Sequence, residues 1–134
     1  MDLKIAAFIA IVVFVFAVQT QAHHSSAMFD QEKLITVSGI LKEFEWTNPH
    51  CWLHVQAADP STGKMVDWSF EMGSVSQIAP QGWKVDSVKP GDKITITGHP
   101  LKDGSRGGQY RSVKLGDGRT FQWIQDQNNP NVAK

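Results

Sequence analysis

The sequence predicts an all-β fold, a small OB-fold-like Greek-key barrel of five or six strands with one short helix. Along residues 34–124, apolar and polar residues alternate in short runs that are separated by Gly, Pro, Asn and Asp. Only residues 74–82 carry the signals of a helix, and they lie between the third and fourth predicted strands. A long first strand followed by this order of elements is typical of the OB-fold. A small antiparallel sandwich is the alternative.

The first predicted strand, residues 34–46, is long and changes parity. Val37 and Leu41 occupy odd positions, whereas Phe44 and Trp46 occupy even positions. A bulge near 42–43 would restore one buried face, because a bulge inserts one extra residue into a strand. Gly39 would let the same strand bend.

The next two predicted strands are residues 51–57, after a turn at 47–50, and residues 65–72. In the second of them, alternation directs Trp68 toward the core and Glu71 toward solvent. The remaining predicted strands are 94–98, 109–115 and 120–124. The short helix at 74–82 is expected to begin at Ser74 or Ser76 and to end at Gly82.

The charge balance argues against nucleic-acid binding. Lys plus Arg and Asp plus Glu number 13 each in 134 residues, so the formal charge is zero. Contact with phosphates requires a basic excess, and we therefore expect no nucleic-acid partner. The single cysteine, Cys51, permits no internal disulfide, and we expect it to be a small buried residue.

Residues 1–22 have the pattern of a signal peptide. Lys4 precedes an uncharged run at 5–18, and small residues at Thr20 and Ala22 fit a cleavage site. The run is shorter than the ~20 residues that a membrane span needs, although an uncleaved anchor is the alternative.

Processing would leave one domain. We expect residues 23–134 to form a single OB-like barrel, with 125–134 as a frayed tail. The protein would then be periplasmic or secreted, and only the signal segment would contact a membrane before cleavage.

Four motifs are distributed over the chain after the signal segment. They are a His-His-Ser start at 23–25, a Trp-x-Asn-Pro-His turn at 46–50, a Trp-x-x-Glu strand at 68–71 and a Lys-Pro-Gly-Asp turn at 89–92. Together they resemble a family of exported bacterial proteins of unknown function. The resemblance implies export and a small β-barrel-like domain, and it implies no established reaction.

Histidines suggest a copper site. Cleavage after Ala22 would place His23 first, and a terminal histidine offers its α-amino group and its own Nδ1 as a chelate. One further imidazole would complete a nitrogen-rich site that suits copper. We expect His50 to be that ligand and His24 to be auxiliary. In these residues alone, the arrangement resembles the histidine brace of copper-dependent polysaccharide oxygenases and some periplasmic copper chaperones.

Each histidine also has a simpler interpretation. His23 and His24 would then be a solvated tail with adventitious metal affinity. His50 would only hydrogen-bond the backbone of its turn and orient Trp46 or Trp52.

The five tryptophans suggest a metal-free alternative. Trp46 and Trp52 are the predicted exposed pair, and such rings can stack on a small ligand or contact a protein partner. The opposing interpretation is that most tryptophans belong to the core. No nucleophile motif is present, so the sequence favours a binding protein over an enzyme, with an oxidase of the brace type as the enzymatic alternative.

Overall fold

The computed structural model describes residues 26–124, and the predicted signal peptide, His23, His24 and the tail at 125–134 lie outside this range. The helical segments are a short helix, α2 (Val75–Ile78), and a 3-10 turn, η1 (Ala79–Gln81). The strands in chain order are β1 (Ile35–Glu45), β2 (Trp52–Ala58), β3 (Met65–Glu71), β4 (Lys93–Pro100), β5 (Gly107–Leu115) and β6 (Thr120–Gln122).

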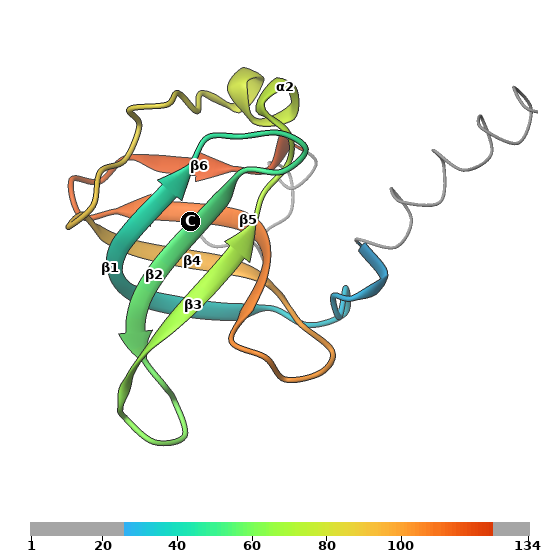
Figure 1. The fold of residues 1–134 in the computed structure, drawn as a ribbon, viewed down its shortest axis with the longest axis vertical. Helices are drawn as coiled ribbons and strands as arrows, with labels where there is room; N and C mark the ends of the chain where they lie inside the picture. Colours follow the sequence, from blue (N-terminus) through green and yellow to red (C-terminus); the bar gives the residue numbers. More distant parts are fainter. Residues whose placement is uncertain (1–25, 125–134) are drawn as a thin grey trace, which may run out of the picture.

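The strands close into an OB-fold barrel (Figure 1). β1 pairs antiparallel with both β2 and β4, and β3 pairs antiparallel with β2. β5 pairs antiparallel with β4 and returns to β3 as the parallel pair that completes the ring. β6 extends β5 beyond the ring. This Greek-key connection of five strands, with a helix between the third and fourth, confirms the predicted fold.

The bent first strand is also confirmed. The register of β1 against β2 shifts between Leu41 and Glu43, so Lys42 is the inserted residue. At Gly39 the chain runs very close to β2, because a Cβ there would lie 2.2 Å from the backbone oxygen of Gln56. Glycine is therefore required where β1 passes from one partner strand to the other.

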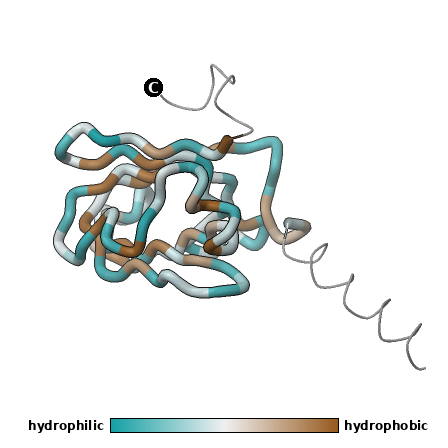
Figure 2. Tube along the Cα trace, turned by 90° about the horizontal axis from the view of Figure 1, so that it is seen from above, coloured by the Kyte–Doolittle hydropathy of each residue, from teal (hydrophilic) through white to brown (hydrophobic). Residues whose placement is uncertain are grey.

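Apolar residues of the strands fill the barrel. On β2 and the residue before it, the buried positions are Cys51, Leu53, Val55 and Ala57. On β3, Trp68 and Phe70 are buried, as the alternation predicted. Figure 2 shows the same alternation as changes of hydropathy along the chain. The barrel therefore follows the period of two that the sequence displays.

Glu71 corrects one prediction. Alternation placed it on a solvent-facing side, but the residue is only 7% exposed. Its strand pairs with β5 at this point, where Glu71 lies opposite Gln109. Closure of the barrel covers a position that would face water in an open sheet.

The helical segment confirms the prediction for 74–82. Ser74 precedes α2, and its backbone N–H donates to Gln77 Oε1 at 2.9 Å. η1 ends at Gly82. The segment covers one end of the barrel (Figure 1) and leads to Trp83, which is buried. The Trp83 ring stacks on Phe121 at 4.1 Å, so β6 packs against the chain that follows the helix.

The closure of the barrel depends on Gly107. A Cβ at Gly107 would lie 2.3 Å from the backbone oxygen of Ser69. We expect Gly107→Ala to separate β5 from β3 and to lower the free energy of unfolding by about 3 kcal/mol. Urea unfolding monitored by tryptophan fluorescence measures this change. Lys102→Ala, at an exposed position of the preceding loop, is the control, and an equal effect of both variants would contradict the role of the close approach.

A second prediction concerns Asp59, which joins two loops. Hydrogen bonds from the Ser61 hydroxyl and backbone N–H, together with the Arg106 guanidinium, hold the pKa of the Asp59 carboxyl well below its ordinary range. Stability from this group is therefore present above the unfolded-state pKa of about 3.9 and is lost as the pH falls toward the lower folded-state pKa.

We expect Asp59→Asn to be less stable than the natural protein at pH 7, with a difference in stability that shrinks as the pH falls below about 4. Urea midpoints measured from pH 7 to pH 2 test this. Asp86→Asn, at an exposed position, should leave the midpoint unchanged throughout. If the urea midpoint of Asp59→Asn were lower by the same amount at every pH, ionisation of the Asp59 carboxyl would not be the source of the stability.

Candidate functional site

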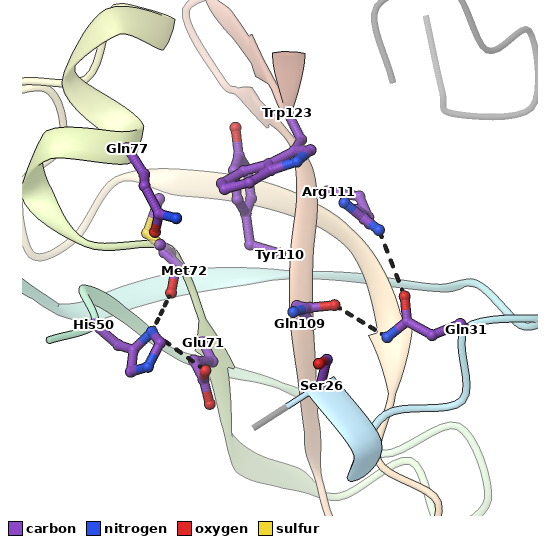
Figure 3. Close-up of a pocket in the computed structure, with 11 residues that line it drawn as sticks. Ser26, Gln31, His50, Glu71, Met72, Gln77, Gln109, Tyr110, Arg111 and Trp123 are labelled. Carbon is purple, nitrogen blue, oxygen red and sulfur yellow. Dashed lines mark hydrogen bonds and ion pairs between the residues drawn. The ribbon is translucent and has the colours of Figure 1, made fainter. Parts of the chain in front are cut away.

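A polar cavity of about 270 Å³ opens where β3, α2 and β5 approach one another (Figure 3). The strand pair that closes the barrel forms part of its wall, and the segment before β1 contributes Ser26. The polar side chains around it are Gln31, His50, Glu71, Gln77, Gln109 and Arg111. The cavity thus collects residues from segments far apart in the sequence.

The turn between β1 and β2 is fixed to the helix. Asn48 Oδ1 accepts the backbone N–H of Val75 at 3.1 Å, which satisfies a free N–H at the start of α2. The Asn48–Pro49 peptide bond is cis. Directly after the turn, the backbone of Cys51 exchanges two hydrogen bonds of 2.9 Å with the backbone that follows β3. His50 is held between these two attachments.

The ring of His50 has a defined orientation. Its Nδ1 lies 3.2 Å from the backbone oxygen of Met72 and 3.4 Å from Glu71 Oε1, as the dashed lines of Figure 3 show. A carbonyl oxygen can only accept, so Nδ1 carries the proton of the neutral ring and Nε2 keeps its lone pair. Within residues 26–124, Nε2 of His50 has no hydrogen-bond partner. The Met72 oxygen that accepts the hydrogen bond from Nδ1 lies directly after β3, and not in the turn that contains His50.

Glu71 is a site residue that sequence reasoning missed. Its side chain is 9% exposed and contacts the Nδ1 side of His50. The alternation within β3 predicted that Glu71 faces solvent, because the sequence of one strand does not show that β3 pairs with β5. The available signal was the Trp-x-x-Glu motif, which ends at this residue.

The opposite wall is a glutamine and arginine cluster. Gln31 Nε2 donates to Gln109 Oε1 at 3.1 Å, and Arg111 Nη2 lies 3.5 Å from Gln31 Oε1. The register of β4 and β5 shifts at Arg111. Because this bulge interrupts the alternation, Tyr110 and Arg111 both reach the cavity although they are adjacent in sequence. No sequence pattern pointed to this wall.

The segment before β1 is anchored beside the cavity. Phe29 is 2% exposed and forms a β-bridge with Leu101. Two backbone hydrogen bonds flank this bridge, one from Asp30 to the oxygen of Pro100 and one from Lys102 to the oxygen of Met28. The chain is thereby held at the cavity up to Ser26. His23 and His24, the predicted ligands that precede it, lie outside the described residues.

The other predicted residues lie elsewhere. Trp52 is half-buried and stacks in parallel on His54, with ring centroids 6.2 Å apart. Trp46 is half-buried at the edge of the core and makes an edge contact with Phe44. Neither tryptophan lines the cavity around His50. Both nitrogens of the His54 ring have partners, Ser69 Oγ at 2.8 Å and Glu45 Oε1 at 2.7 Å.

His50 and Glu71 do not form a complete metal site by themselves. In the part of the chain that the structure describes, no group of three or more His, Cys, Asp or Glu side chains could hold a metal ion. Residues 26–124 therefore supply at most part of the ligand set of a metal at this cavity. Among residues 26–124, no helix is long and apolar enough to cross a membrane.

Known proteins give a family but no activity. No curated protein matches the sequence. Among solved structures, the chain is similar to the mitochondrial single-stranded DNA binding protein Rim1 from S. cerevisiae, at 11% sequence identity and a TM-score of 0.46. That match covers 62% of this chain and 92% of the Rim1 chain. A family model matches residues 10–111, and the chain therefore belongs to the "Family of unknown function (DUF6152)".

Proposed function

We propose that this is an exported copper-binding protein, periplasmic or secreted, in which the α-amino group and ring of His23 bind copper together with His50. His24 is an auxiliary ligand, and the protein binds copper without catalysing a reaction. The observation that carries the proposal is the orientation of His50, whose Nδ1 is held by the Met72 carbonyl while Nε2 remains able to donate a lone pair. Nitrogen ligands of this kind favour copper over magnesium or calcium.

The surroundings of His50 match those of a metal-binding histidine. Such residues commonly donate the second ring N–H to a backbone carbonyl or a carboxylate, which fixes the ring and raises its basicity. Met72 supplies the carbonyl at 3.2 Å, and Glu71 supplies the carboxylate at 3.4 Å. His54 lacks this property because both of its nitrogens are engaged. His50 is thus the better candidate ligand of the two.

The anchored N-terminal segment supports the same proposal. Ser26 lines the cavity with His50, and the bridge at Phe29 holds the segment there. His23 lies three positions before Ser26, and three residues span at most ~10 Å when extended. His23 is consequently within reach of the cavity mouth. An N-terminus released by cleavage after Ala22 would supply the free amine.

The metal-free alternative uses Trp46 and Trp52 as a surface for a ligand or a protein partner. In that case tryptophan fluorescence would respond to an organic ligand in the presence of a chelator, and copper affinity would be weak. The stacking of Trp52 on His54 gives such a ligand one ordered aromatic face.

We expect His50→Ala to lower copper affinity by orders of magnitude, because it removes one of the three nitrogen donors. Titration of the processed protein against a competing chelator measures the change. His54→Ala is the matched control and should retain the affinity of the natural protein. Equal losses in both variants would contradict the role of His50.

The free amine is tested with the same titration on a protein that carries one extra residue ahead of His23. Tight 1:1 binding that disappears on extension would identify the amino terminus as a ligand. If the extra residue left the copper affinity unchanged, His23 and His24 would be a solvated tail and the proposed site would be wrong.

A separate prediction concerns Glu71, which orients His50. We expect Glu71→Gln to weaken copper binding by roughly 10- to 100-fold, the usual cost of removing a group that holds a metal ligand. Glu45→Gln is the control, since Glu45 makes the corresponding contact with His54. Circular dichroism of both variants would verify the fold. An unchanged affinity in Glu71→Gln would remove this carboxylate from the site.

A further inference from the structure

Polar side chains form a regular grid on the outer face of β1, β4, β5 and β6. On β4, Ile94 and Ile96 are buried in the barrel, so Thr95 and Thr97 lie on the opposite face of the strand, although Thr97 is only 5% exposed. Strand register aligns their partners in two rows, Ser38, Thr95, Lys114 and Thr120 in the first and Thr36, Thr97, Ser112 and Gln122 in the second. Neighbouring strands lie ~4.8 Å apart, so each row is about 14 Å long.

This face is hollowed. Two cavities of about 460 and 450 Å³ adjoin along it and share Thr95 and Lys114. The first extends past Lys93 and the second past Ser112 to β6. We call this pair of cavities the outer groove. A twisted sheet is concave along one diagonal, and the outer groove follows that concavity.

The hydroxyl groups of the outer groove retain hydrogen-bonding capacity. Thr36 pairs with Thr97 at 3.0 Å, and Ser38 pairs with Thr95 at 2.8 Å. Two hydroxyls carry two protons and each pair uses one, so each pair keeps one donor. Ser112 is only 7% exposed, lines the groove, and makes no side-chain hydrogen bond within residues 26–124. The Ser112 hydroxyl is therefore available to a ligand in the groove.

The charge of the outer groove is positive. Lys93 and Lys114 line it, and neither cavity has an Asp or Glu in its wall. Neither lysine forms an ion pair with another residue of the described chain. Because the whole protein has a formal charge of zero, this positive charge is a local property of the face.

We propose that the outer groove binds an acidic polysaccharide. Sugar hydroxyls would exchange hydrogen bonds with the two rows of side chains, and sugar carboxylates would pair with Lys93 and Lys114. An extended glycan that crosses the strands would meet one polar side chain at each strand along a row. Single-stranded nucleic acid fits less well, since its recognition relies on exposed aromatic rings, and the ring of Phe121 in the groove is stacked on Trp83.

The outer groove is independent of the copper proposal. No residue of its wall also lines the cavity around His50. Binding can therefore be measured in the presence of EDTA, and the result does not depend on whether copper binds.

The probe is an oligogalacturonate of about six sugars, titrated into the full chain by calorimetry at low salt with EDTA. We expect binding that weakens as salt is added, because the charges are exposed. The double variant Lys93→Gln and Lys114→Gln should lose at least about tenfold in affinity. The matched control, Lys64→Gln and Lys102→Gln, removes the same charge outside the groove and should bind like the natural protein.

Ser112→Val tests the hydroxyl separately, since valine keeps the shape and suits a strand. It should weaken binding several-fold and leave the urea midpoint near that of the natural protein. Neutral dextran should not bind. The proposal would be overturned if both lysine double variants bound oligogalacturonate with equal affinity, or if dextran bound as tightly as oligogalacturonate. It would also be overturned if oligo(dT) bound more tightly than oligogalacturonate and depended on the same lysines. Self-association of the chain that the Lys93 and Lys114 changes abolish would also overturn it.

Discussion

The short parallel contact between β3 and β5 determines the rest of this structure. It joins Ser69–Glu71 to Gly107–Gln109 and converts a meander of strands into a closed barrel. The two backbones meet so closely that Gly107 leaves no room for a Cβ beside the oxygen of Ser69. The same contact brings Glu71 against Gln109 and buries a carboxylate that would otherwise face water. The contact that closes the barrel consequently also forms part of the wall of the cavity around His50.

The turn before β2 depends on that closure in a second way. Asn48 joins it to α2, and His50 joins it to the carbonyl of Met72 at the end of β3. A turn that was free in solution would sample many orientations of the imidazole, at a cost in entropy for any ligand. Here the ring is oriented before a ligand arrives. The proposed copper site would benefit from this fixed ring, because an oriented ligand loses less entropy on binding.

The sequence predicted what is local and missed what is long-range. The bulge at Lys42, the helix after Ser74 and the inward position of Trp68 each follow from periodicity within one segment. Glu71 was misassigned because its burial comes from β5, which lies some forty residues further along the chain. Arg111 was missed because nothing in the local sequence marks the bulge that brings it to the cavity. Turn residues such as His50 could be named as candidates, but their partners across the barrel could not.

The two proposed sites differ in charge, and this difference has a physical use. The cavity around His50 is lined by both the Glu71 carboxylate and the Arg111 guanidinium, whereas the outer groove contains Lys93 and Lys114 and no carboxylate. A net charge of zero is compatible with such local differences, because positive and negative side chains need not be spread evenly over the surface. Exposed charges more than ~10 Å apart are largely screened at physiological salt. A copper ion and an acidic glycan could therefore occupy their sites together, because no residue lines both sites.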